Sequence, residues 1–339
     1  MITLGIETSC DETSVAILKD GKKQLSNVVV SSLKEHEKYG GVIPEIASRA
    51  HLETLIACLD LALKKAKKKP ENIDLIAVAQ GPGLMGSLLV GLSAAKALAL
   101  SLQKPLVGVD HVIAHIYSGI LSEPKLKFPY LGLVVSGGHT MILRMDSPSR
   151  ISILGRTIDD AAGEAFDKVA KILCLRYPGG PEVDRLAKGQ DSASIKFSRP
   201  FPSKDSLDFS FSGIKTAVFY KVNELEKKKP LSLKIKKQIC AGFQEAVCDV
   251  LTEKSLRAAK NEGLYTIVVG GGVSANSRLR QKLRFAAKKE SIQVIFPDFD
   301  LCRDNAAMIA ALGAALYREG KTDTLDLSSY PDFMRHRLT

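Results

Sequence analysis

The sequence predicts an α/β protein made of two similar lobes that face each other across a cleft. Apolar strand-like and helix-like segments alternate along the chain, and their order in the first part recurs in the second. A length of 339 residues lets each lobe bury its own core. We expect a first lobe at residues 1–125, a second at 126–325 with a helical insertion at about 159–260, and a tail at 326–339.

The first lobe is expected to begin with an antiparallel meander. Apolar residues alternate in Ile2–Glu7 and Ser14–Leu18, and a third strand is predicted at Leu25–Val30, with polar turns between the three. Pro44 suits the first position of a helix, and an apolar stripe with helical spacing continues from it to the lysine run before Pro70. A long helix should therefore follow the meander.

Two strand-and-helix pairs are predicted next. They are a strand at Leu75–Ala79 with a helix over about Ser87–Leu102, and a strand at Leu106–Val109 with a helix opening near Asp110. The apolar segment from Leu84 to Leu102 contains glycines, serines and a lysine, so we expect a buried helix and no membrane span. The N-terminus shows no basic, signal-like segment.

The second lobe repeats the first in recognisable letters. Leu4-Gly5-Ile6 aligns with Leu131-Gly132-Leu133 at an offset of 127, and the same offset pairs Ser9 with Ser136. This repeat predicts a second hairpin. Its expected strands are Tyr130–Val135 and Thr140–Arg144; later elements are strands at Tyr265–Val269 and Gln293–Phe296, with helices from about Ala275 and near Arg303.

The helical insertion separates the second hairpin from the later strands. Its polar stretch, Gly189–Leu207, is expected to be a loop outside the core. The expected helices of the insertion are Asp159–Leu173, Gly180–Ala187, Ile214–Glu226 and Leu233–Ala259.

Charge and cysteine content restrict the classes of function. Lys+Arg total 48 against 37 Asp+Glu, a net charge of +11, which favours a polyanionic partner such as nucleic acid. Lysine runs such as Lys64–Lys69 also occur on solvated helix faces, so both interpretations stay open at this point. The 6 cysteines show no C-x-x-C spacing, which is typical of reduced thiols in a cytosol.

A metal site is predicted from three side chains. His111 and His115 are spaced i, i+4 on a predicted helix, so both imidazoles project from one face. The equivalent helix of the second lobe opens with Asp304, which the repeat would bring to the same place. Two histidines and one aspartate suit Zn²⁺ or Fe²⁺ and leave positions open for substrate oxygens.

Three glycine-rich turns follow predicted strands and suggest a nucleotide site. They are Gly81-Pro82-Gly83, Ser136-Gly137-Gly138 and Gly270-Gly271-Gly272. Turns without side chains let backbone N–H groups approach phosphate oxygens. None of the turns is a Walker A motif. Asp167 and Asp184 lie near the rigid turn Pro178–Pro181 and are candidates for binding ribose hydroxyls.

Several blocks together identify a resemblance to a known family. Nearly end to end, the chain closely resembles the bacterial TsaD family of tRNA N6-adenosine threonylcarbamoyltransferases. The blocks are Gly5–Thr13, His111–His115, Val135–Thr140, Asp159–Lys168, Asp208–Gly213 and Asp304-Asn305. The resemblance implies a duplicated actin/hexokinase-like fold of the ASKHA, ribonuclease H-like class. It also implies transfer of threonylcarbamoyl from threonylcarbamoyl-AMP to N6 of adenosine 37, forming t6A in tRNAs that read codons beginning with A and releasing AMP.

The resemblance also implies the site residues and one divalent metal ion per subunit, Fe²⁺ or Zn²⁺, with Fe²⁺ favoured. The metal ligands would be His111, His115 and Asp304. The general base is not identified, and Glu12 and Asp11 are candidates by position alone. The residues that would hold the adenylate are Val134, Val135, Ser136, Gly137, Gly138, Asp167, Gly180, Asp184 and Asn276.

The chain departs from the family pattern at two places. Archaeal and eukaryotic relatives place a tyrosine metal ligand just before the S-G-G turn, where this chain has Val134-Val135, so three protein ligands are expected. Glycine is expected after Asp304-Asn305, where this chain has Ala306, whose methyl group should tighten the helix start without removing a ligand.

Three other functions compete with this interpretation. A small-molecule kinase or ATPase of the same superfamily would need Mg²⁺ on carboxylates. A metalloprotease would need a glutamate where Val112 and Ile113 stand. The net charge alone would also fit a non-enzymatic tRNA-binding module. Family resemblance further implies a cytoplasmic enzyme that works with tRNA, a paralogous TsaB-like dimerisation partner and a TsaE-like small ATPase, and not with a membrane.

Overall fold

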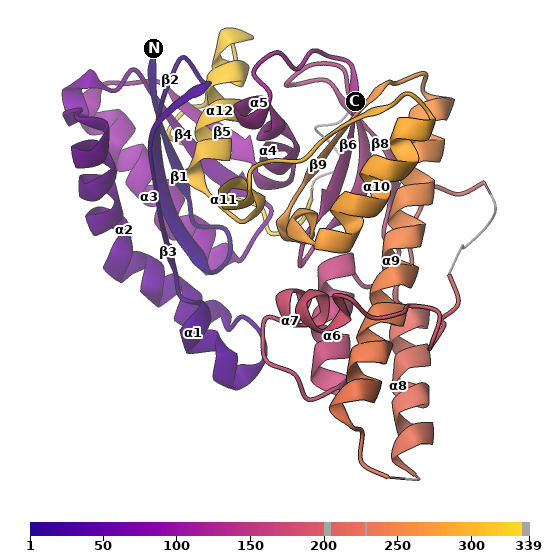
Figure 1. Ribbon diagram of the computed structural model, residues 1–339. Helices are drawn as coiled ribbons and strands as arrows, with labels where there is room; N and C mark the ends of the chain where they lie inside the picture. The colour runs from indigo at the N-terminus through magenta and orange to yellow at the C-terminus, as the bar shows by residue number, and fades with distance from the viewer. Residues whose placement is uncertain (200–204, 228, 334–339) are drawn as a thin grey trace. The chain divides into compact units, whose positions relative to one another are not determined.

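The computed structural model describes residues 1–199, 205–227 and 229–333 (Figure 1). The chain divides into two compact units. Unit 1 comprises Met1–Phe128, Asp146–Ile151 and the C-terminal segment from Pro297, and unit 2 comprises Pro129–Met145 and Ser152–Phe296. The final segment of the expected second lobe thus belongs with the first, and Arg335–Arg337 lie outside the described residues.

Unit 1 is built on a five-stranded sheet with the order β3-β2-β1-β4-β5. The first three strands are antiparallel, while β4 and β5 run parallel to β1, so the predicted meander is confirmed. The strands are β1 (Ile2–Glu7), β2 (Glu12–Lys19), β3 (Lys23–Ser31), β4 (Leu75–Gly81) and β5 (Leu106–Asp110).

Helices α2 (Pro44–Ala66) and α3 (Met85–Leu102) pack together on this sheet, as predicted. By length and composition α3 is apolar enough to cross a membrane, with a mean hydropathy of 1.6. Its inner residues, including Leu92 and Ala95, nevertheless belong to the core of unit 1. Short elements complete this part: α1 (Leu33–His36), η1 (Glu37–Tyr39), η2 (Pro70–Asn72), α4 (His111–Tyr117) and α5 (Gly119–Ser122).

Helix α12 (Ala306–Arg318) explains why the C-terminal segment joins unit 1. It is apolar and almost entirely buried, and it packs against β1, β2, β4 and β5. Small residues allow this close approach. A Cβ on Gly5 would lie 2.3 Å from the carbonyl oxygen of Ala306, and one on Gly313 would lie 2.4 Å from Cβ of Ala77.

Unit 2 repeats the same sheet, with the order β10-β9-β6-β7-β8. Strand β6 is antiparallel to β7 and parallel to β9, which is parallel to β10, so the predicted duplication is confirmed. The strands are β6 (Tyr130–Val135), β7 (Thr140–Met145), β8 (Ile151–Arg156), β9 (Thr266–Gly270) and β10 (Gln293–Ile295). The helices after β9 and β10 begin slightly later than predicted, behind η3 (Gly272–Ala275) and α11 (Phe299–Cys302), with α10 at Ser277–Lys289.

The predicted insertion is present between β8 and β9. Its helices are α6 (Ala162–Ile172), α7 (Gly179–Ala187), α8 (Ser212–Glu226) and α9 (Leu233–Asn261). The stretch Gly189–Leu207 forms no helix or strand in its described part, but it is not wholly outside the core. Phe197 belongs to the core of unit 2, and Ile195 and Leu207 pack against that core, because the polar loop contains apolar side chains at intervals.

Candidate functional site

The three predicted metal ligands lie together in unit 1. One side-chain donor atom from each of His111, His115 and Asp304 lies within 4.8 Å of the others. Nε2 of His115 is 3.1 Å and Nε2 of His111 is 3.5 Å from Oδ1 of Asp304. The imidazole rings meet edge to face, with centres 4.6 Å apart.

These separations fit a shared cation. Two donors that each lie about 2.1 Å from a tetrahedral ion are about 3.4 Å apart, which falls between the two measured distances. Both histidines are almost fully buried, and Asp304 is partly buried. Imidazole and carboxylate together suit Zn²⁺ or Fe²⁺. The residues present therefore fit the group that the sequence implied.

Glu7 orients one of the ligands, and the sequence analysis had not assigned it this role. Its Oε2 lies 2.9 Å from Nδ1 of His111, and Oγ of Ser9 lies 3.1 Å from the same atom. Because Nδ1 is held in this way, Nε2 faces Asp304. Glu7 lies in the block Gly5–Thr13, and the sequence feature that could have pointed to it is a lone glutamate at the end of an apolar strand.

Acidic neighbours favour the protonated form of His111. Burial alone would lower the pKa of His111, but the charges of Glu7 and Asp304 outweigh burial and raise that pKa to about 9. A positive charge is therefore favoured at this point of the structure. Nδ1 of His115 is buried and has no hydrogen-bond partner among the residues that the structure describes.

Asp304 does not open the helix, contrary to the expectation. Asn305 is the N-cap of α12 and accepts a hydrogen bond from the backbone of Met308 at 3.1 Å, so Asp304 precedes the helix in a bend. The backbone N–H of Ala306 donates to Oγ of Ser14 at 2.9 Å. Alanine at this position thus lies against the sheet and leaves the aspartate with the histidines.

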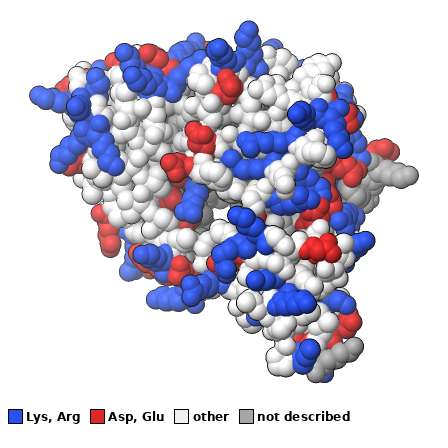
Figure 2. Space-filling model, viewed as in Figure 1, with Lys and Arg blue, Asp and Glu red and all other residues white. Residues whose placement is uncertain are grey.

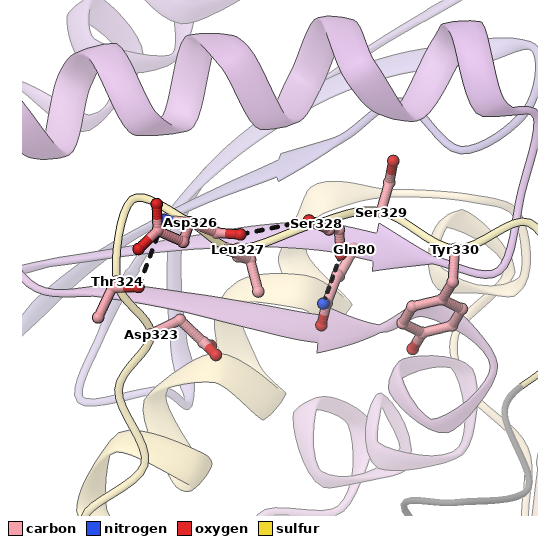
Figure 3. Close-up of a pocket in the computed structure, with 8 residues that line it drawn as sticks. All are labelled: Gln80, Asp323, Thr324, Asp326, Leu327, Ser328, Ser329 and Tyr330. Carbon is pink, nitrogen blue, oxygen red and sulfur yellow. Dashed lines mark hydrogen bonds between the residues drawn. The ribbon is translucent and has the colours of Figure 1, made fainter.

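The C-terminal tail holds the start of the histidine helix. Asp110 caps α4 by accepting from the backbone of Ile113 at 3.0 Å, and the Tyr330 hydroxyl donates to the other oxygen of Asp110 at 2.8 Å. Beside it, Gln80 donates to the carbonyl of Ser328 at 2.7 Å. Figure 3 shows these tail residues along β4 and β5, where they line a cavity of about 380 Å³.

Of the two candidate bases, Asp11 lies in the turn that follows β1 and Glu12 is the first residue of β2. Glu12 is almost completely buried at the start of β2. Burial raises the pKa of Glu12 well above its usual range, and the carboxylates of Asp304 and Asp11 raise it further. Glu12 therefore lies within electrostatic reach of Asp304, a member of the His–His–Asp cluster.

Several of the predicted adenylate residues are linked to one another within unit 2 by a ring of contacts. The ring also includes Gly163, Gly179, Gly271 and Ser277. The backbone N–H of Gly163 donates to the carbonyl of Ser136 at 3.1 Å, and Oδ1 of Asp167, on the same helix, accepts from Gly179 at 2.7 Å. Helix α7 continues from Gly179 to Asp184.

Asp184 closes this ring. It accepts from the backbone and the hydroxyl of Ser277 at 3.2 and 2.8 Å. Ser277 follows Asn276, and the glycine turn before it packs on β6, since a Cβ on Gly271 would lie 2.5 Å from the carbonyl oxygen of Val135.

The glycines of the three turns differ in what surrounds them. A Cβ on Gly81 would strike Tyr330, and one on Gly83 would strike the backbone of Ser9, so this turn is glycine-rich because the protein packs against it. In the described part of the chain, nothing lies within 4 Å of a Cβ placed on Gly137, Gly138 or Gly180. Open backbone at these positions is compatible with a ligand.

Other members of the set are already engaged with the protein. Val134 and Val135 are fully buried, backbone included, and pair in the sheet with Met141 and Thr140, so neither residue presents a group to a ligand in this structure. The side chain of Asn276 caps α10 by accepting from Leu279 at 2.9 Å, and it donates to Gln244 at 2.8 Å. Burial raises the pKa of Asp167, although the backbone N–H groups of Gly179 and Gly180 counteract this effect.

Comparison with known proteins confirms the family resemblance of the sequence. The sequence profile of the family described as TsaD, tRNA N6-adenosine threonylcarbamoyltransferase, matches residues 23–311. Proteins of that name from Thermosipho africanus and Dictyoglomus turgidum are 51% and 50% identical to this chain, over 98% of it and 99% of their own length.

Solved structures show the fold alone. HypF of T. kodakarensis covers 94% of this chain with a TM-score of 0.64 and 15% identity, over 48% of its own length. Component A of the Acidaminococcus fermentans 2-hydroxyglutaryl-CoA dehydratase covers 95% of this chain and 100% of its own, with a TM-score of 0.55 and 17% identity. These neighbours share the predicted ASKHA-type architecture. By sequence match, end-to-end identity and fold, the chain belongs to the TsaD family of tRNA N6-adenosine threonylcarbamoyltransferases.

Proposed function

We propose that this protein transfers the threonylcarbamoyl group from threonylcarbamoyl-AMP to N6 of adenosine 37 in tRNAs reading codons that begin with A, forming t6A and releasing AMP. The family match supports the reaction, and the observation that carries the chemistry is the cluster of His111, His115 and Asp304. An exocyclic adenine amine is a weak nucleophile, so the site must activate the carbonyl and stabilise the departing adenylate.

His111, His115 and Asp304 would hold one divalent ion, Fe²⁺ or Zn²⁺, and Fe²⁺ is the ion that the family resemblance favours. When bound, the ion supplies Lewis-acid polarisation of a substrate oxygen. Glu7 fixes the tautomer of His111 by holding Nδ1, so that Nε2 keeps a free lone pair. The buried setting of both imidazoles excludes bulk water from the donor atoms.

The ring of unit 2 would bind the adenylate. The exposed backbone at Gly137 and Gly138 can donate N–H groups to phosphate oxygens, which stabilises charge on the leaving group. Asp167 and Asp184 would accept ribose hydroxyls, and Gly180 leaves room for the ligand. Glu12 and Asp11 remain the candidates, by position, for accepting the proton that leaves the amine.

The donor set argues against the competing functions. A kinase of this fold would need oxygen ligands for Mg²⁺, whereas two of the three donors here are imidazoles. Val112 and Ile113 are buried between the histidines, where a metalloprotease would need a glutamate. A binding module without catalysis would leave the buried His–His–Asp cluster without a purpose.

We further propose a cytoplasmic setting and two protein partners, a TsaB-like paralogue and a TsaE-like small ATPase. The outer faces of α2 and α3 support a protein partner, because Leu52, Ile56 and Leu89 are 66%, 68% and 49% exposed. A Leu52→Glu/Ile56→Glu variant should lose co-elution with the paralogue while its melting temperature stays unchanged. Continued co-elution would show that the partner binds another face.

Reconstitution tests the proposed function directly. The protein is incubated with threonine, bicarbonate, ATP, the adenylate-forming synthase and unmodified tRNA, with and without the two partner proteins. We expect t6A in nucleoside mass analysis, and none when His115→Ala replaces the wild-type protein. Absence of t6A under every condition, with active synthase, would contradict the proposal.

A further inference from the structure

The most basic helix of unit 2 is not used by the site described above. Helix α10 carries six basic residues and no acidic one within Ser277–Lys289. By contrast, α2 carries three acidic and three basic residues. Figure 2 shows Lys and Arg side chains gathered over α10 on the face in view. A helix with charges of one sign repels itself, so its composition calls for an explanation beyond solubility.

Two of the six charges are compensated within the protein. Arg278 forms two hydrogen bonds to Glu245, at 2.6 and 2.9 Å. Lys282 pairs with both Glu245 and Asp249. These contacts hold α10 against α9, so Arg278 and Lys282 have a structural role.

Of the other four, Arg280 is half-buried and donates from Nε to the carbonyl of Ser274 at 2.7 Å, whereas three face solvent. In the part of the chain that the structure describes, Arg284, Lys288 and Lys289 are exposed and form no ion pair. The guanidinium groups of Arg280 and Arg284 both lie 5.0 Å from the centre of the Phe296 ring, which holds them in place. Lys289 lies 4.4 Å from the ring centre of Phe285, whose side chain is 65% exposed.

Helix α10 begins beside the ring of contacts in unit 2 that would bind the adenylate. The helix begins at its N-cap, Asn276, and Ser277 is bound by Asp184. Thirteen residues extend about 20 Å, so the charges lead away from the ring over a distance of several phosphates. The loop that also carries basic residues is a weaker candidate, because Arg199 is paired with Asp249 at 2.6 Å.

We propose that the exposed basic face of α10, formed by Arg284, Lys288 and Lys289, binds the sugar-phosphate backbone of the tRNA. The proposal rests on the proposed function for the identity of the polyanion. Arginine suits phosphate recognition because its planar fork binds two oxygens, and exposed Phe285 offers a surface on which an unpaired base can stack. The face fixes where the RNA lies without reading its sequence.

The test compares two triple variants of equal charge change. Arg284→Gln/Lys288→Gln/Lys289→Gln alters α10, and Lys65→Gln/Lys67→Gln/Lys69→Gln alters the exposed end of α2 as the control. Binding of unmodified tRNA to the protein alone is measured from 50 to 200 mM salt. We expect the α10 variant to raise Kd about tenfold or more and to lower the salt slope by roughly 0.7–0.9 per lost contact. The control should match the wild type.

A single substitution separates stacking from charge. Phe285→Ala should weaken tRNA binding about tenfold while leaving the salt slope unchanged. In the reconstituted reaction, the α10 triple variant should raise KM for tRNA and keep kcat and the melting temperature of the wild type.

An unchanged Kd and slope in the α10 variant would overturn the proposal, as would an equal loss in the control or a wild-type protein that binds no tRNA. If the wild type binds tRNA through α10 but forms no t6A, the proposed function fails and the surface stands. If it forms t6A with the α10 variant at an unchanged KM, the surface fails and the function stands.

Discussion

The turn after β1 and the turn after β6 occupy the same place in two sheets of the same order, yet they carry opposite chemistry. The first holds buried side chains, with Glu7 and Ser9 against the imidazole of His111. The second exposes bare backbone at Gly137 and Gly138. After a duplication, one copy of the turn provides groups that attract a cation and the other provides N–H groups that attract an anion.

The largest expected effect tests the cationic half of this comparison. His111→Ala or His115→Ala should reduce bound metal from about one ion per chain to almost none, because two ligands are too few to hold the ion. Transfer activity should disappear with the metal. Metal analysis after gel filtration measures the first effect, and circular dichroism checks that the fold is intact. Full metal content in both variants would remove the distinction between the two turns.

The anionic half is tested by Gly137→Val. A side chain there meets open space in the protein, so stability should be unchanged. It would fill the path to the backbone N–H groups, and adenine nucleotide affinity should fall about a hundredfold or more through lost hydrogen bonds to phosphate. Calorimetry with AMP provides the measurement.

Gly271→Ala is the matched control for Gly137→Val. Its φ of +92° and the clash with the carbonyl oxygen of Val135 predict a loss of stability in thermal melts. Equal AMP affinity in wild type and Gly137→Val would show that the open turn faces no phosphate.

Glu7→Gln tests whether the charge of Glu7 supports metal binding by His111. The amide keeps the shape of the side chain but removes the charge that supports Nδ1 of His111. Metal affinity should fall about 10–100-fold, since the imidazole loses its orienting carboxylate. Competition with a chelator of known affinity measures this change. An unaltered affinity would mean that the geometry of the turn, without its charge, is enough.

The smallest expected effect concerns ion pairs that stabilise the fold of unit 2 and are not expected to contact a ligand. Hydrogen bonds from Arg278 and Lys282 lower the pKa of Glu245 from its usual value of 4.5 to about 2. A folded-state pKa below the unfolded value gives stability that is present above pH 4.5 and lost as pH falls through 2. Glu245→Gln should therefore cost about 1–3 kcal/mol at pH 7, and this difference should shrink below pH 4.5.

Urea unfolding at pH 7 and at pH 3 measures that difference. The pair of Glu182 with Arg185 provides the matched control: Arg185 is 64% exposed, so solvent screens the pair and Glu182→Gln should change stability little. A difference between wild type and Glu245→Gln that is independent of pH would assign the effect to packing.

Most of the fold could be predicted from patterns within the chain. The meander of unit 1 follows from alternation in Ile2–Glu7, and the second sheet follows from the repeat at Leu131–Leu133. The placement of α12 could not be predicted in this way, because the repeat assigns it to the second half. Its position on β1 depends on the small surfaces of Gly5 and Gly313, which only three-dimensional packing reveals.

The candidate site was predicted unevenly for a similar reason. Spacing alone brought together His111 and His115, and the repeat added Asp304. The roles of Glu7 and Tyr330 were not predicted, since each contacts the histidine helix from more than a hundred positions away in the chain. The glycines of the turn Gly81–Gly83 have a reason that the sequence does not show, because there the protein packs against its own backbone.

Unit 1 is formed by segments that lie far apart in the sequence, and this determines when its parts become available during synthesis. Its sheet is encoded by the first 110 residues, but Asp304 and Tyr330 are among the last 36. A growing chain emerges from its N-terminus, so every residue of unit 2 is synthesised before the third member of the His–His–Asp cluster exists. Nascent chains therefore carry an open, two-histidine precursor of the cluster, and any ion that needs all three side chains can be captured only at the very end of synthesis or afterwards.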